Sequence, residues 1–351
     1  MLKKIGIIFG GNSTEHDASV HSYLNVINSY ILDKKMSKIK QVIYIKDDKI
    51  FIFNKNFPTQ ESDITSKNHY NLKDLLKVID KDLYWFSLLH GNEGEDGCYQ
   101  GLAEIFKLNG SFGDVLPACV SMNKWVMAEL SQAITKSKVK CIPYLRMDKK
   151  TKEKEANEFL LEFPSDYYVV KPNRLGASLF TEKIAREKVI SFFRSKEFKN
   201  IFKYDKDVLL QKFAKGREFT FGLVEIDKSL ISLPLVEIFT SENFLGHKEK
   251  HKKGFVEVTF DKVENDLKNR IIENSKLLYK ELNFSNFCRF DYILSNNNLY
   301  LLEANSIPGI MSCSIFTKMI TMKKISIPKM IDSFAAAENH KILKEYRYEI
   351  E

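Results

Sequence analysis

The sequence predicts an α/β fold whose N-terminal part contains a parallel β-sheet. Three observations lead to this prediction: short apolar runs resemble strands, helical stretches alternate with them, and glycines follow two of the strands, at Gly10-Gly11 and at Gly91. The strand-like runs lie at residues 3–9, 41–45 and 83–89, and the helical stretches lie at residues 72–78 and 99–107. Such alternation is typical of a Rossmann-like sheet with ligand-binding loops at the carboxyl ends of its strands.

The first helix is expected to begin at Ser13, which can cap it, with Glu15 in the first turn where the helix dipole favours negative charge. Polar residues 54–71 predict a long surface connection. Later elements suggest two further units, and the domain limits are predicted at 1–110, 111–206 and 207–351. The expected helices lie at 124–137, 151–163, 267–282 and in the tail 317–351, and the expected strands at 141–146, 167–171, 208–213 and 219–226.

Composition excludes several classes of protein. The net charge is +8, but the lysines are spread along the chain without a basic stripe, a zinc-finger motif or an RNP motif, so no nucleic-acid partner is expected. No apolar run approaches the roughly 20 residues that span a bilayer, and no signal-peptide pattern precedes the first strand. The five cysteines lack C-x-x-C spacing. We therefore expect a cytoplasmic protein with reduced thiols and no membrane partner.

The most informative segment is a predicted β-hairpin near the C-terminus. With a three-residue loop at 296–298, Asp291 lies opposite Glu303, and Arg289 and Asn305 share their face of the hairpin. Two neighbouring carboxylates repel unless one is protonated or a cation lies between them. Carboxylate and amide oxygens suit Mg²⁺, with phosphate oxygens as its other ligands. The alternative interpretation is an ordinary surface hairpin with an Arg–Asp ion pair and no metal.

A second candidate site is the loop 173–178. Gly176 and its small neighbours can bring backbone N–H groups close to a phosphate. Lys171, just before the loop, is costly to bury unless its ammonium meets an anion. A plain hairpin turn is the alternative interpretation.

With these residues in view, the chain resembles the D-alanine–D-alanine ligase family of the ATP-grasp superfamily. The resemblance extends over nearly the whole chain, in family order. It rests on Gly10-Gly11-Asn12-Ser13-Thr14-Glu15, His90-Gly91 with Glu95-Asp96-Gly97, Met122-Asn123-Lys124, Lys171-Pro172 with Gly176-Ala177-Ser178, and Arg289-x-Asp291 with Leu302-Glu303-Ala304-Asn305-Ser306-x-Pro308-Gly309. It implies an N-terminal α/β domain followed by a two-domain ATP-grasp fold.

The resemblance also implies a reaction and its residues. An ATP-dependent ligase would join two D-amino acids through an acyl phosphate, for peptidoglycan precursor synthesis, with Mg²⁺ or alternatively Mn²⁺, and would form a homodimer. The residues expected to contact ATP are Lys124, Lys171, Gln211, Lys212, Glu218 and Lys250. The expected metal ligands are Asp291, Glu303 and Asn305, and the residues expected to bind amino acids are His90, His251 and Ser314. The expected catalytic residues are Glu15, Arg289, Gly309 and Ser178: Glu15 would pair with the first ammonium, and Arg289 and the Gly309 N–H would stabilise an oxyanion. For Glu15, His90 and Lys250, a purely structural or solvated role is the alternative.

Three positions depart from the family pattern. Ala177 replaces a serine and, if Lys250 is the loop lysine, His251 replaces a tyrosine; Asn123 replaces an aspartate. A protonated imidazole near the second pocket would repel an ammonium and tolerate a hydroxy acid. The second substrate therefore stays open between D-alanine and D-lactate, D-serine or another amine. The alternative from a different functional class is a paralogue that binds nucleotide without catalysing a reaction.

Overall fold

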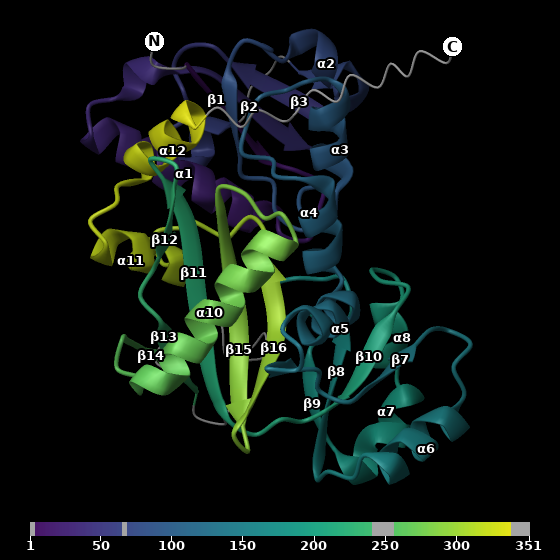
Figure 1. The fold of residues 1–351 in the computed structure, drawn as a ribbon. Coiled ribbons are helices and arrows are strands. Elements are labelled where there is room, and N and C mark those ends of the chain that lie inside the picture. Colours follow the sequence, from purple (N-terminus) through teal and green to yellow (C-terminus); the bar gives the residue numbers. More distant parts are fainter. Residues whose placement is uncertain (1–3, 65–68, 241–255, 338–351) are drawn as a thin grey trace, which may run out of the picture.

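The computed structural model describes residues 4–64, 69–240 and 256–337 as three β-sheets with helices on their faces (Figure 1). The mixed α/β class expected from the sequence is confirmed. Among the described residues, no helix combines the length and the apolar character that crossing a membrane requires. Short 3₁₀ turns occur at Met36–Lys38, Glu61–Ile64, Leu72–Asp74 and Arg186–Lys188.

The N-terminal sheet has the strand order β4-β3-β2-β1-β5. Its centre is parallel, because β1 pairs with β2 and β5 in the same direction, whereas β3 and β4 add an antiparallel edge. The strands are β1 (Ile5–Gly10), β2 (Ile39–Lys46), β3 (Lys49–Phe53), β4 (Tyr70–Asn71) and β5 (Tyr84–Ser87), and the helices are α1 (His16–Leu32), α2 (Leu75–Val78) and α3 (Cys98–Ile105). The predicted parallel core is present, and the described parts of the surface connection, 54–64 and 69–71, contain a 3₁₀ turn and β4.

Helix α1 begins three residues later than the sequence suggested. Its N-cap is Glu15, which makes no side-chain cap bond. The Ser13 hydroxyl instead accepts a hydrogen bond from the Glu15 N–H (3.1 Å) and donates one to the His90 carbonyl oxygen (2.6 Å). The prediction of a Ser13 cap was therefore wrong, because this hydroxyl ties the loop after β1 to the loop after β5.

The second sheet is antiparallel and has the order β7-β10-β8-β9. Its strands are β7 (Tyr144–Met147), β8 (Tyr167–Pro172), β9 (Glu182–Ala185) and β10 (Val208–Lys212), and its helices are α6 (Glu153–Glu162), α7 (Val189–Phe193) and α8 (Lys196–Ile201). The helices bury one face of the sheet, where Phe159 packs with Tyr168, Val170 and Leu210. Lys171 follows the buried Val170 on β8 and points to the opposite face of this sheet.

The third sheet has the order β14-β13-β11-β15-β16-β6, and β12 pairs with β11. Its strands are β6 (Val139–Lys140), β11 (Arg217–Ile226), β12 (Ser229–Ser232), β13 (Val236–Thr240), β14 (Val256–Phe260), β15 (Phe287–Ser295) and β16 (Asn298–Asn305). The helices are α4 (Val115–Met122), α5 (Lys124–Ile134), α10 (Asn265–Glu281), α11 (Ile315–Met322) and α12 (Ile327–Ala336). Residues of α5, α10, β11 and β15 form one core on one face of this sheet.

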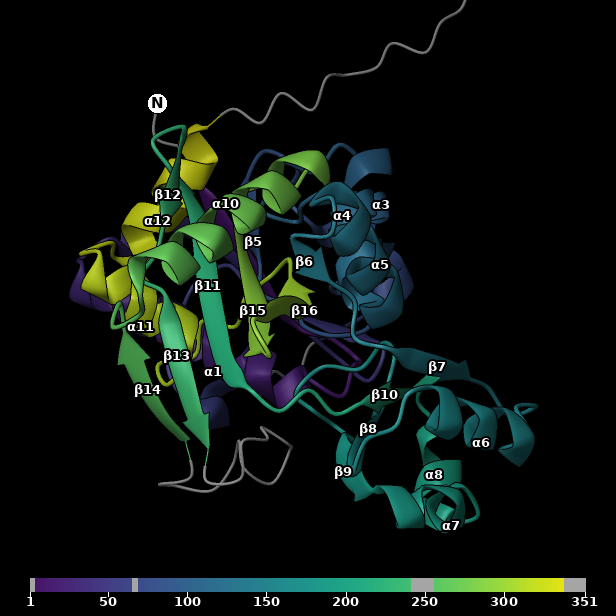
Figure 2. The same cartoon turned by 60° about the horizontal axis from the view of Figure 1, so that its bottom comes forward.

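The N-terminal sheet and the third sheet share a continuous apolar core. The Phe86 ring of β5 stacks with the Phe287 ring of β15 at a centroid distance of 6.2 Å, and the Phe287 ring meets the Phe334 ring of α12 at 5.4 Å. The Asn25 side chain of α1 also donates a hydrogen bond to the Ile310 carbonyl oxygen (2.7 Å). The two views place α11 and α12 beside α1 and β11 (Figure 2). This packing holds the loops of the N-terminal sheet against the segment that follows β16.

The domain limits at residues 110 and 206 stay a prediction. Strand β6 pairs with β16 in the third sheet, and β10 pairs with β7 and β8 in the second. Two segments of the chain thus cross between these sheets.

Candidate active site

Strands β15 and β16 form the expected hairpin, with Asp291 directly opposite Glu303 and Arg289 opposite Asn305. The predicted three-residue loop was wrong. Ser295 pairs with Asn298, so the loop has two residues, Asn296 and Asn297, both in the left-handed region with φ of 48° and 61°. Two successive residues of positive φ are the requirement of a type I′ turn.

A β-bulge restores the predicted pairing beyond this shorter turn. Tyr292 pairs with Leu301, whereas the next residue, Asp291, pairs with Glu303, so that Leu302 is the extra residue. Without the bulge, Glu303 would share the face of Leu299 and Leu301, which lie in the buried core. The extra residue shifts the alternation and turns Glu303 to the face of Asp291. Bulges commonly re-aim side chains at functional sites in this way.

The Asp291 carboxylate is held from two sides. It accepts hydrogen bonds from Arg289 Nε (3.0 Å), from Arg289 Nη2 (2.8 Å) and from the Thr220 hydroxyl (2.5 Å). Thr220 lies on β11, directly opposite Asp291. The second carboxylate, Glu303, has Oε1 3.8 Å from Arg289 Nη2. A fixed bidentate pair keeps Asp291 in one orientation.

The residues of this hairpin fit a hard divalent cation. Asp291 and Glu303 supply carboxylate oxygens, and the buried Asn305 Nδ2 has no hydrogen-bond partner. Amide oxygen and nitrogen positions are assigned from hydrogen bonding, so an amide without a bonded donor can equally offer its oxygen to a cation. Among the described residues, no group of three or more His, Cys, Asp and Glu side chains could hold a metal. The cation would therefore need phosphate oxygens as further ligands, as Mg²⁺ usually does.

Two lysines lie across from these carboxylates. Lys171 is 8% exposed, and burial, followed by the nearby Lys124, lowers its pKa to about 8, while Glu303, Cys141 and Glu218 act in the opposite direction. The Lys124 ammonium donates a hydrogen bond to the Leu175 carbonyl oxygen (2.6 Å). Charged groups from the second and third sheets thus act on the buried Lys171 ammonium. A buried cation with a shifted pKa is typical of a functional site, and here it would suit an anion.

The remaining candidate ATP-binding residues lie along the same strands. Gln211, which is buried, and Lys212 are the last two residues of β10, and Glu218 is the second residue of β11, opposite Ile293. The Lys212 N–H donates to the Pro143 carbonyl oxygen (2.9 Å), so β10 and the segment before β7 are joined at this end. Lys250 and His251 lie outside the described residues, and their roles stay predictions.

The glycine loop approaches Glu15 so closely that a side chain at residue 176 would not fit. A Cβ added to Gly176 would lie 2.1 Å from Glu15 Oε1, and one added to Gly91 would lie 2.9 Å from Ser13 Oγ. Ala177 and Ser178 both have positive φ, 52° and 55°, a conformation that costs energy in residues other than glycine. Three loops, after β1, β5 and β8, therefore meet at Glu15.

His90 lies behind this meeting point. It is buried, and its Nε2 is 3.4 Å from Ser22 Oγ and its Nδ1 3.8 Å from Glu95 Oε2. Burial and the Arg289 charge lower the pKa of His90 to about 4, so the ring is neutral at pH 7. Burial, and then the Glu15 carboxylate, raises the pKa of Glu95 well above its ordinary value. His90 therefore makes its contacts within the protein, with Ser22 and Glu95, and the acidic pair of Glu15 and Glu95 offers a place for an ammonium.

The segment after β16 completes the site. A Cβ added to Gly309 would lie 3.6 Å from the Ser314 hydroxyl, so these two candidates are neighbours. Ser314 is the N-cap residue of α11 but makes no side-chain cap bond. Its hydroxyl and the N-terminus of α11 can receive a carboxylate.

Sequence reasoning missed two supporting residues. Thr220 orients Asp291, and the fully buried Asn173 joins the glycine loop to the N-terminus of α5. Asn173 Nδ2 donates to Asn123 Oδ1 (2.9 Å), and Asn173 Oδ1 accepts from the Trp125 N–H (3.2 Å). Asn173 begins the loop 173–178 that the sequence indicated but had no role of its own there, and no motif marks Thr220. Each residue acts through partners distant in sequence.

Comparisons with known proteins cover nearly the whole chain. The family model for the N-terminus of D-Ala–D-Ala ligase matches residues 4–111, and the model for its C-terminus matches residues 134–335. A curated D-alanine–D-alanine ligase from Wigglesworthia glossinidia brevipalpis is 28% identical over 95% of this chain and 97% of its own length.

Solved structures show the same fold. The VanG D-Ala:D-Ser ligase from Enterococcus faecalis has a TM-score of 0.76 at 23% identity, covering 96% of this chain and 99% of its own. The D-alanine–D-alanine ligase from Bacillus anthracis complexed with ATP has a TM-score of 0.69 at 21% identity, covering 95% and 96%. With family models matching most of its length, the chain belongs to the D-alanine–D-alanine ligase family, whose members are ATP-dependent ligases that form C–N bonds.

Proposed function

We propose that this chain joins two D-alanine molecules, with ATP as the energy source, to supply the dipeptide of peptidoglycan precursors. The observation that supports this most is the bulged hairpin, which turns Glu303 toward Asp291. Both carboxylates lie within 4.0 Å of the Arg289 guanidinium, and Glu303 also acts on the buried Lys171 ammonium. A cytoplasmic location and a homodimeric state stay predictions, which rest on the family resemblance.

The first step would activate the carboxylate of the first amino acid. One carboxylate oxygen attacks the γ-phosphorus, an acyl phosphate forms and ADP leaves. Lys124 and Lys171 would hold the phosphates by charge, and Gln211, Lys212 and Glu218 would hold the nucleoside. Catalysis of phosphoryl transfer consists mainly of positioning and charge neutralisation. Mg²⁺ held by Asp291, Glu303 and Asn305 would supply additional neutralisation at the phosphate oxygens.

The second step would form the new bond. The amine of the second amino acid attacks the acyl carbon, the amine loses a proton, and phosphate leaves. Arg289 and the Gly309 N–H would donate hydrogen bonds to the oxyanion, where such donors contribute most. Glu15 would pair with the first ammonium, and Ser314 would hold the second carboxylate.

The identity of the second substrate can be tested directly. Purified protein would be incubated with ATP, Mg²⁺ and D-alanine alone, or with D-alanine plus D-serine, D-lactate or another amine, between about pH 6 and 9. We expect phosphate release with D-alanine alone and a D-Ala–D-Ala product by mass spectrometry. Release that requires D-lactate or D-serine would replace the D-alanine assignment but keep the ligase. No release with any pair would favour the non-catalytic paralogue.

Asn173 is expected to position Lys124 for ATP. Its backbone carbonyl oxygen accepts from the Lys124 N–H (3.2 Å), a bond that Asn173→Ala keeps. The variant loses the side-chain bonds to Asn123 and to the Trp125 N–H, and this loss should loosen the helix end that carries Lys124. We expect the KM for ATP to rise about tenfold, with a smaller change in kcat, since each lost hydrogen bond is worth about 1 kcal/mol. Steady-state kinetics measures both constants.

The matched control is Asn71→Ala, which removes another asparagine that receives a backbone hydrogen bond, from the Lys73 N–H, far from this site. It should leave the KM for ATP unchanged. An equal loss of kcat and stability in Asn173→Ala, with unchanged KM, would indicate a purely structural role.

A further inference from the structure

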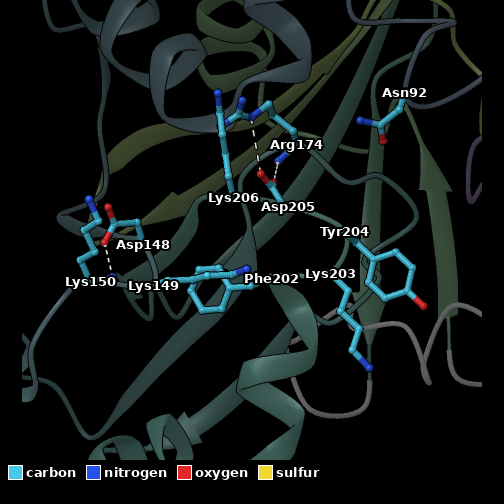
Figure 3. Close-up of a pocket in the computed structure, with 10 residues that line it drawn as sticks. All are labelled: Asn92, Asp148, Lys149, Lys150, Arg174, Phe202, Lys203, Tyr204, Asp205 and Lys206. Atoms are coloured by element: carbon cyan, nitrogen blue, oxygen red, sulfur yellow. Dashed lines mark hydrogen bonds and ion pairs between the residues drawn. The ribbon is translucent and has the colours of Figure 1, made fainter.

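A polar pocket lies at one end of the second sheet, apart from the proposed ATP-binding residues that the structure describes. It has a volume of about 530 Å³, within the range of small-molecule sites. Its lining includes four lysines, Arg174 and Asn92, and it is called here the lysine pocket (Figure 3). The lysines are Lys149, Lys150, Lys203 and Lys206.

The lysine pocket carries a net positive charge, because five of its lining residues are cationic and two, Asp148 and Asp205, are acidic. Within the described ranges, none of the four lysine ammonium groups lies within 4.0 Å of a carboxylate oxygen. Asp148 keeps its negative charge, but its carboxylate is held by the Lys150 N–H (2.7 Å) and the Thr151 N–H (3.0 Å). Four like charges around one hollow repel each other and favour an anion.

The base of the lysine pocket is built from buried groups. The Arg174 N–H donates to Asp205 Oδ2 (2.5 Å), and the Arg174 guanidinium pairs with Asp207, which also accepts from Arg146 Nη2 (3.0 Å). Asp205 and Asp207 are buried. Figure 3 shows Arg174 directed at Asp205 with Lys206 beside it. The cation at the base is therefore fixed, while the lysine ammonium groups remain available to a ligand.

The opposite wall is aromatic and connects to the glycine loop. Phe202 and Tyr204 line the pocket, and the Tyr204 ring, 51% exposed, stacks with the Phe180 ring at a centroid distance of 5.1 Å. Phe180 comes shortly after the glycine loop (residues 173–178), to which the lining residue Arg174 belongs, and Asn92 belongs to the loop after β5. A ligand here would contact two of the three loops that meet at Glu15.

We propose that the lysine pocket binds a small molecule carrying a phosphate group, with the phosphate among the lysines and the rest of the ligand against Tyr204. The pocket is concave and small, which favours a small ligand over a nucleic-acid backbone. A bound molecule would hold the loop after β5 against the glycine loop, and thereby change the affinity of the active site for ATP.

The test uses inorganic pyrophosphate as the probe and isothermal titration calorimetry of the full-length protein. Nucleotide and Mg²⁺ are left out, because ADP itself carries phosphates and would compete for the lysine pocket, and ionic strength is held constant. We expect a pyrophosphate-binding site whose Kd is raised at least about tenfold in Lys203→Glu/Lys206→Glu, because two charge-assisted contacts are lost. The matched control is Lys276→Glu/Lys280→Glu on α10, with the same charge change on two exposed lysines.

The control should keep the wild-type Kd within about twofold, since distant surface charges are screened. Equal affinity in the wild type and the lysine-pocket variant, equal losses in both variants, or no binding to the wild type would overturn the proposal. If the glutamate variant does not fold, as judged by its melting curve, Lys203→Met/Lys206→Met decides by the same criterion.

Discussion

Asp291→Asn is expected to reduce kcat by a factor on the order of 10³ or more, because the proposed metal site loses half of its carboxylate charge. Asparagine has nearly the same shape, and its oxygen can still accept from Thr220 and Arg289 Nε, while its NH₂ group would face Arg289 Nη2. The fold should therefore be kept, with a modest loss of stability. Asp291→Ala should also abolish turnover, but it would leave both donors unpaired and lower the stability further. Phosphate release at saturating ATP and D-alanine measures the effect, and thermal unfolding checks the fold.

A second measurement separates loss of the metal from loss of positioning. Titration of the protein with Mn²⁺ and ADP, followed by electron paramagnetic resonance, should show bound Mn²⁺ in the wild type and at least about tenfold weaker binding in Asp291→Asn. The matched control is Glu153→Gln, which removes a carboxylate paired through two bonds of 2.7 Å with Arg194 at the surface. Near-normal turnover and metal binding in Asp291→Asn would remove the metal assignment.

The hairpin shows how far the sequence could predict this site. The pairing of Asp291 with Glu303 was expected from a three-residue loop, yet it results from a two-residue turn and a bulge at Leu302. The loop is one residue shorter than predicted, and the strand after it contains one residue more than predicted. The two differences cancel, so the pairing of Asp291 with Glu303 is the predicted one. A bulge has no sequence pattern of its own here, so alternation alone would have placed Glu303 with Leu301 in the core.

Local sequence patterns predicted the position of an element correctly where that position depends on the element's own residues. The strands β1, β2, β8, β10 and β11 and the helices α5, α6 and α10 lie within a few residues of their predicted positions. The start of α1 was misplaced because the Ser13 hydroxyl bonds to the His90 carbonyl oxygen, a partner 77 residues away. Contacts of this kind, like those of Asn173 and Thr220, depend on the assembled fold and cannot be derived from local preference.

Lys171→Met is expected to lower kcat/KM for ATP by about 10²-fold, since a buried ammonium facing phosphates contributes strongly in a site that excludes water. The same change should raise the melting temperature without nucleotide. Methionine fills similar space without the cost of burying a charge beside Lys124. Lower activity with higher stability is the signature of a residue retained for function. Lys276→Met, at an exposed position on α10, is the control and should change neither quantity.

The role of Lys171 can be tested most specifically by the pH dependence of kcat/KM and of stability. Because the pKa of Lys171 is lowered to about 8 from 10.5, the ammonium that binds phosphate is lost above pH 8, and wild-type kcat/KM for ATP should fall there while the variant stays flat. Stability should move the opposite way. Between about pH 8 and 10.5 the unfolded chain binds more protons at this lysine than the folded chain does, so wild-type stability gains a rising contribution that the variant lacks. The stabilisation by Lys171→Met should therefore be largest below pH 8 and shrink toward pH 10.5. Parallel pH profiles of wild type and variant, in both kinetics and unfolding, would contradict the role of Lys171 as the buried phosphate-binding cation.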